Sequence, residues 1–200
     1  MKKLLFVLIV FMLSVNLFSQ SNEDSVKIWG WSRDGKVGIS EIADDGMGGI
    51  RAIVINAIND AVLWERRCAA YDFDQRKLLD EFFRVCRQNG IQIREERPFA
   101  PSGTFIRNNG RIINIIINTV IRNGFWGEEI GSYSVIAETG GRRKTILSVN
   151  RAEPSILGLQ FTGYHISPHE ERAIIIIKKS LPPYWSGNIY IGCNLLTGFR

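Results

Sequence analysis

The sequence predicts a mainly β (α+β) protein in which one amphipathic helix packs on antiparallel sheets. Three observations predict this class: many short β-rich segments separated by turn residues, one segment with helical periodicity, and two isoleucine-rich runs. Asp-Gly, Asn-Gly and Gly-Gly pairs between apolar segments are typical of β-hairpins. We therefore expect antiparallel meanders in a propeller-blade-like or sandwich-like arrangement of sheets.

The first nineteen residues are predicted to be a secretory signal peptide. Lys2 and Lys3 precede an unbroken apolar run, Leu4 to Leu13, and small polar residues follow up to Ser19. That run is about half as long as a membrane-spanning helix needs to be, which favours cleavage over anchoring. We expect residues 20–200 to form a single β-rich domain, exported to the periplasm or the extracellular space, with no transmembrane segment after cleavage.

Composition narrows the function classes. The chain of 200 residues has 45% hydrophobic and 22% charged residues, which excludes intrinsic disorder. Without Lys2 and Lys3 the formal net charge falls from +5 to +3. This weak basic excess, together with export, argues against a nucleic-acid partner. No cofactor motif is present, so we expect no cofactor.

The first half of the domain is predicted to be a four-stranded meander. Ser32-Arg33-Asp34-Gly35 is a hairpin turn, and the loop from Asp44 to Gly49 crosses between strands. Trp29 and Trp31, two residues apart, are expected on one strand face in the core. The predicted strands are Val26 to Trp31, Lys36 to Ile42, Ile50 to Ile58 and Ala61 to Arg67.

A helix is predicted from about residue 74 to 88. Asp74 is a candidate N-cap, and Phe73 and Leu78 have the spacing of a hydrophobic staple. Asn89-Gly90 is a suitable stop. The apolar residues recur at helical period and form one face. These residues are Leu78, Leu79, Phe82, Phe83 and Cys86.

The second half returns to β-structure. Its predicted strands are Thr104 to Arg107, Arg111 to Ile121, Ser132 to Glu138, Arg142 to Asn150, Gly158 to Ile166, Glu171 to Lys179 and Asn188 to Leu195. Two runs, Ile112 to Ile117 and Ala173 to Ile177, do not alternate between apolar and polar residues. Strands of this kind are buried on both faces. We expect both runs to be central strands, covered by the helix on one face and by a second sheet on the other.

The three cysteines leave two interpretations open. Cys68 and Cys86 could form a disulfide after export, which leaves Cys193 unpaired. Alternatively, all three could be buried thiols, because free cysteine is among the most buried residue types. No metal-binding cysteine spacing is present.

Two hairpin turns share a pattern. Gly30 to Val37 and Gly163 to Ala173 each combine an aromatic strand end, a serine, a tight charged turn and an apolar strand. The first resembles the Ser-Pro-Asp-Gly-Lys turn of the WD40-like β-propeller repeat of TolB-type periplasmic proteins. The second keeps Ser167-Pro168 but has His169-Glu170 in place of Asp-Gly. The order of elements also resembles that of small secreted bacterial proteins, a similarity that implies no activity.

Candidate catalytic residues are few. His165 and His169 are the only histidines, and acidic residues lie next to His169, so both are weak metal-ligand candidates. The alternative is that they belong to a solvated hairpin turn. Cys193 could act as a nucleophile only if the fold brings it to His165. No catalytic motif is recognisable, so no catalytic residue is assigned.

Aromatic residues in loops are the best binding candidates. Trp126 lies between glycines, and Tyr184 and Trp185 follow two prolines. Rigid loop aromatics of this kind are typical of binding surfaces. The alternative is that they fold back and fill the end of a sheet. The leading hypothesis is a non-enzymatic binding domain for an envelope protein or glycan. The alternatives are a small secreted hydrolase that uses His165, His169 and Cys193, and a structural envelope component.

Overall fold

The structure is a computed structural model that describes residues 26–42, 49–69, 74–99, 103–183 and 185–200. The predicted signal peptide, Phe73, Tyr184 and most of the loop from Asp44 to Gly49 lie outside the described residues. Within those ranges, no helix is long and apolar enough to cross a membrane.

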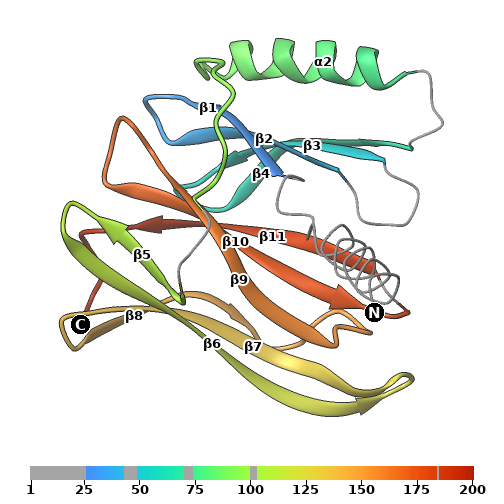
Figure 1. Cartoon of the computed structure of the whole chain (residues 1–200), viewed down its shortest axis with the longest axis vertical. Coiled ribbons are helices and arrows are strands. Elements are labelled where there is room, and N and C mark those ends of the chain that lie inside the picture. Colours follow the sequence, from blue (N-terminus) through green and yellow to red (C-terminus); the bar gives the residue numbers. More distant parts are fainter. Residues whose placement is uncertain (1–25, 43–48, 70–73, 100–102, 184) are drawn as a thin grey trace, which may run out of the picture.

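The predicted mainly β fold with a single helix on the sheets is confirmed (Figure 1). In the described part of the chain, eleven strands form three antiparallel sheets of four, three and four strands. We call these the first, middle and outer sheets. The first sheet is the meander β1 (Val26–Trp31), β2 (Lys36–Ile42), β3 (Ile50–Asn56) and β4 (Ala61–Cys68).

The turn between β1 and β2 follows the sequence prediction. Ser32 Oγ accepts a hydrogen bond from the Lys36 amide at 2.8 Å and lies 2.6 Å from Asp34 Oδ1. Gly35 has a φ of 80°, a left-handed conformation that favours glycine. The turn chemistry in the sequence therefore suffices to determine this hairpin.

The expected common face of Trp29 and Trp31 is wrong. A β-bulge between Ile28 and Gly30 interrupts the alternation of β1. Trp29 consequently faces the helix, where its ring packs edge-on against Phe83, whereas Trp31 is buried on the opposite face of the sheet. A bulge adds one unpaired residue, so side chains two apart no longer share a face.

Helix α2 (Gln75–Gln88) confirms the predicted segment and its apolar face. Leu78, Phe82 and Cys86 are buried against the first sheet. The expected side-chain cap is wrong: Asp74 makes no capping hydrogen bond, and its carboxylate pairs instead with Lys77 at 2.8 Å. The helix ends at Asn89 and Gly90, as predicted.

The outer sheet contains the longest strands. Its order is β5 (Phe105–Asn108), β6 (Arg111–Gly124), β7 (Gly127–Thr139) and β8 (Arg142–Val149). Two-residue turns join β5 to β6 and β6 to β7. The middle sheet has the order β11-β10-β9, with β9 (Gly158–Ile166), β10 (Arg172–Leu181) and β11 (Trp185–Asn194).

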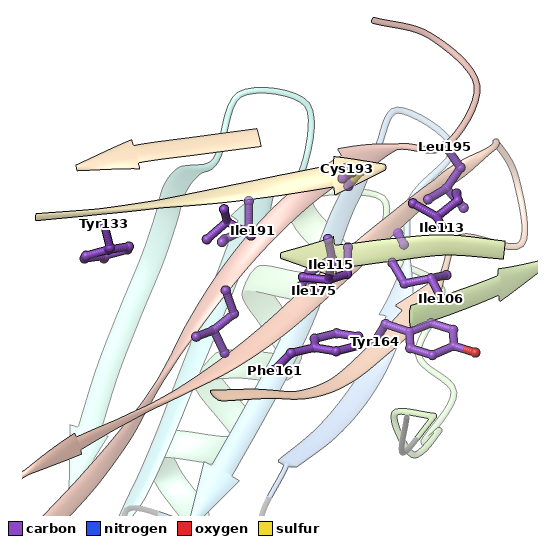
Figure 2. Packing of buried hydrophobic residues seen from close by; sticks show 14 of the residues in the cluster. Ile106, Ile113, Ile115, Tyr133, Phe161, Tyr164, Ile175, Ile191, Cys193 and Leu195 are labelled. Atoms are coloured by element: carbon purple, nitrogen blue, oxygen red, sulfur yellow. The ribbon is translucent and has the colours of Figure 1, made fainter. Parts of the chain in front are cut away.

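The elements stack in four layers: α2, the first sheet, the middle sheet and the outer sheet (Figure 1). Each pair of neighbouring layers encloses one apolar cluster. The largest cluster lies between the middle and outer sheets, where Ile175 and Ile191 meet Ile115 (Figure 2). The middle sheet is therefore covered by a sheet on each face.

The two isoleucine runs have different environments. Residues Ala173 to Ile177 in β10 are all at most 2% exposed, as predicted. The covers differ from the expectation, because α2 packs on the first sheet and both covers of β10 are sheets. For Ile112 to Ile117 in β6 the prediction is wrong. Ile112 is 48% exposed, since no element of the described residues covers the outer face of the outer sheet.

The three cysteines are buried, and no disulfide joins any two of them. Cys68 and Cys86 belong to the cluster beneath α2, and Cys193 lies between the middle and outer sheets. Of the two interpretations of the sequence, the structure has the one without a disulfide.

Candidate functional site

The tip of the β6–β7 hairpin exposes two adjacent aromatic side chains. Phe125 is 89% exposed and Trp126 is 54% exposed. Their rings pack edge to face, with centroids 5.2 Å apart and an interplanar angle of 85°. The Gly124–Gly127 pair closes the hairpin, so the two aromatics form its two-residue turn. We call Phe125 and Trp126 the aromatic tip.

A buried carboxylate fixes the conformation of this tip. Glu129 is 3% exposed, and its two oxygens accept hydrogen bonds from the Trp126 amide at 3.3 Å and the Ser155 amide at 3.0 Å. The Ser155 amide, more than any other group, holds the pKa of Glu129 below its usual value, so the carboxylate stays ionised. The tip is thereby tied to the loop that precedes β9.

A side chain at position 124 would displace the same carboxylate. A Cβ atom at Gly124 would lie 2.0 Å from the Glu129 carboxyl carbon, far inside van der Waals contact. Gly127 has a φ of 100°, which side chains of L-residues rarely adopt. The two glycines that flank the aromatics therefore help to form the turn that exposes Phe125 and Trp126.

The side chains of the other two predicted binding aromatics, Tyr184 and Trp185, are not described by the structure. Tyr184 lies outside the described residues. Trp185 is the first residue of β11 and pairs with Leu181, and its side chain also lies outside the described part. A ligand-binding role stays a prediction for these two residues.

His165 is a buried structural residue and does not belong to a solvated turn. It is 4% exposed in β9, and its Nδ1 accepts a hydrogen bond from the Trp31 indole N–H at 3.0 Å. Its Nε2 lies 2.6 Å from a Glu96 carboxylate oxygen. Because Nδ1 is an acceptor, the proton lies on Nε2, which donates to Glu96. Burial lowers the pKa of His165, which favours this neutral ring.

His169 and Cys193 are not brought to His165. His169 is exposed in the β9–β10 turn, where its amide donates to Ser167 Oγ. Cys193 lies opposite Ala173 and His165 lies opposite Ile174, so the thiol and the imidazole point to opposite faces of the middle sheet. Burial raises the pKa of the Cys193 thiol, which disfavours the thiolate. Among the described residues, no three His, Cys, Asp or Glu side chains are grouped to hold a metal ion.

A second buried polar group, not predicted from the sequence, is centred on Glu41. Glu41 is 5% exposed and accepts hydrogen bonds from Arg51 at 2.9 Å, from Asn188 at 2.6 Å and from the Tyr190 hydroxyl. It links the first sheet to the middle sheet. The signal was present in β2, because period two places Glu41 on the face of Val37 and Ile39.

A cavity of about 180 Å³ lies beside this group, under α2. Its lining is mostly apolar, and it has the size of an aromatic ring rather than of a large ligand. The residues that line it are Lys27, Trp29, Ser40, Glu41, Ile42, Ile50 and Leu79.

No protein-family model, no curated protein and no solved structure matches the chain.

Proposed function

We propose that the protein is an exported, non-enzymatic binding domain of the bacterial periplasm or cell envelope, and that the aromatic tip is its contact surface for a protein partner. The observation that carries this proposal is the fixed exposure of Phe125 and Trp126 by the buried Glu129. The proposed export depends on the basic and apolar character of residues 1–19.

The exposed tip has the composition of a binding hot spot. Large aromatic side chains dominate interface energies, and they lose little conformational entropy when they are held in place before binding. The Glu129 hydrogen bonds hold the Trp126 backbone in this way. Ordering of the tip on binding therefore offsets little of its favourable contact energy with the partner.

A protein partner is favoured over a glycan by the neighbours of the tip. Val120 is 64% exposed and Ile121 is 50% exposed on the same hairpin. With the aromatics, they make this end of the hairpin largely apolar on both faces, whereas a sugar would need several polar side chains to pair with its hydroxyl groups. Apolar anchors surrounded by polar residues are typical of protein interfaces.

The alternatives have less support. A hydrolase that uses His165, His169 and Cys193 would need these side chains to converge, and the middle sheet separates His165 from Cys193. A structural envelope component would not need a preorganised tip.

The proposal is tested by photo-crosslinking from position 126 in the envelope, followed by affinity measurement with the captured protein. Phe125→Ala and Trp126→Ala should each weaken binding by at least about tenfold, because they remove the anchor side chains. Both residues are exposed, so thermal unfolding should be unchanged.

Phe99→Ala is the matched control, because Phe99 is an exposed aromatic (56%) on a different segment. It should leave the affinity unchanged. Equal loss in all three variants, or capture that does not depend on position 126, would contradict the proposal. Binding to purified envelope polysaccharide that Trp126→Ala abolishes would instead assign a glycan ligand.

A further inference from the structure

Strand β6 has an open edge over most of its length. It is 14 residues long, but its outer neighbour β5 has four residues and pairs only with Arg111 to Asn114. The last bond on this side runs from the Ile115 amide to the Thr104 carbonyl at 2.6 Å. From Ile116 to Gly124, no described strand pairs with the outer edge of β6.

The backbone groups at this edge follow from the alternation of an antiparallel ladder. The Ile115 amide points to the β5 side, so the odd-numbered residues beyond it also point away from β7. These residues are Ile117, Thr119, Ile121 and Asn123. Among the described residues, none of their amides or carbonyls has a backbone partner across that edge.

Most features that normally protect an edge strand are missing from this stretch; the bulge opposite Val120 and Ile121 places its extra residue, Gly131, on β7 and leaves the alternation of β6 intact. Soluble proteins block such edges with lysine, proline, inward-pointing charges or short strands. The stretch from Ile116 to Gly124 contains no proline and one charge, Arg122. Val120 and Ile121 add exposed apolar surface on its two faces. A β-strand of this composition is a ready partner for another strand.

We propose that the partner is a second copy of this chain, paired antiparallel through Ile116 to Gly124 with Val120 on the two-fold axis. The free stretch is bounded by the last β5 bond at Ile115 and by the turn at Phe125, and its midpoint is Val120. In this register Thr119 exchanges both backbone hydrogen bonds with the partner's Ile121, and the same pairs recur across the axis.

Charge and packing agree with this register. Arg122 lies opposite the partner's Asn118, so no like charges meet. Val120, which is 64% exposed, packs against the partner's Val120 at the non-hydrogen-bonded position, where side chains approach most closely. The pairing joins two four-stranded outer sheets into one continuous sheet.

The dimer has a functional consequence that goes beyond the proposed function. Antiparallel pairing places the two aromatic tips at opposite ends of the shared edge, so one dimer presents two contact surfaces. Two linked sites bind a repeated partner more tightly than one site does. The dimer itself does not depend on which partner the tip binds.

Sedimentation equilibrium of the purified protein, expressed as the full chain, tests the proposal. The wild type should show a concentration-dependent monomer–dimer equilibrium. Thr119→Pro removes one outward amide without touching the β6–β7 ladder, and Val120→Lys places two like charges on the axis. Each should raise the dimer dissociation constant by at least about tenfold. Ile112→Lys, exposed on the same strand but beside β5, should not.

A cysteine at the axis tests the register directly. Non-hydrogen-bonded cross-strand pairs have Cα atoms about 4.5 Å apart, which permits a disulfide. Val120→Cys should form a disulfide-linked dimer under mild oxidation, while Ile112→Cys should not, and the native thiols are buried. A monomer at all concentrations, a dimer insensitive to both edge variants, or no Val120→Cys crosslink would overturn the proposal. A monomer that still binds its partner through Trp126 would overturn the dimer alone.

Discussion

The two isoleucine-rich strands, β6 and β10, have similar sequences and different surroundings. β10 lies in the middle sheet, and its residues Ala173 to Ile177 are buried by the first sheet on one face and the outer sheet on the other. β6 lies in the outer sheet, where Ile113 and Ile115 point inward and Ile112 is half exposed. An apolar run on both faces therefore allows double burial but does not ensure it.

The difference shows that packing within one chain does not account for the exposed apolar side chains of β6. Burial in the core accounts for every side chain of the β10 run, since each belongs to an apolar cluster. It does not explain Val120 and Ile121, which are exposed at the distal half of β6. Surface of this kind is typical of interaction sites.

Alanine variants of the two strands should separate them most strongly. Ile175→Ala removes a fully buried side chain and should lower the free energy of unfolding by about 3–4 kcal/mol. Ile112→Ala removes a half-exposed one and should lower it by less than about 1 kcal/mol. Urea unfolding followed by circular dichroism measures both. Equal losses would mean that β10 does not lie between two sheets.

The two interfaces of the middle sheet also differ from each other. The interface with the outer sheet is a continuous apolar cluster, whereas the interface with the first sheet contains His165 and Glu41 with their hydrogen-bond partners. The stability of the interface with the outer sheet should therefore depend little on pH. The stability of the interface with the first sheet should depend on pH through His165.

A smaller effect is expected from titration of this histidine. The pKa of His165 is lower in the folded protein than its ordinary value of 6.5, so the unfolded chain binds more protons. The contribution of neutral His165 to the free energy of unfolding is complete above about pH 6.5, and it is lost as the pH falls below that value toward the lower pKa of the folded state. Urea unfolding between about pH 8 and pH 5.5 should show this slope.

His165→Gln should flatten that slope relative to the wild type, because the proton-linked group is gone. His169→Gln is the matched control, since His169 is exposed in the β9–β10 turn, and it should leave the slope unchanged. A His165→Gln variant that keeps the full wild-type slope would mean that the Trp31–His165 contact does not couple folding to protonation.

Much of the fold could be predicted because its signals are local. The Asn109-Gly110 and Gly140-Gly141 turns and the apolar face of α2 are short-range patterns, and they determine the hairpins and the helix. The layer order could not be predicted, because it depends on which sheet covers which. The β1 bulge is a further example: Gly30 accommodates the Gln92 carbonyl, a contact made 62 residues away in the chain.

The candidate site was predicted in part. The flanking glycines single out Trp126, and its side chain is 54% exposed rather than folded back on a sheet; a ligand-binding role stays a prediction. The role of Glu129 could not be deduced, because its second oxygen binds the Ser155 amide from a distant loop. His165 illustrates the opposite error: its turn-like sequence context suggested a solvated residue, while the partner that buries it, Trp31, comes from another sheet.

Native-state hydrogen exchange of β10 tests the layered architecture most directly. The amides of Ala173 to Ile177 should exchange only through global unfolding, because sheets cover both faces and strands pair on both edges. Amides of β4, an edge strand with Val62 and Leu63 exposed, should exchange much faster. Equal, rapid exchange in β10 and β4 would contradict a doubly covered middle sheet.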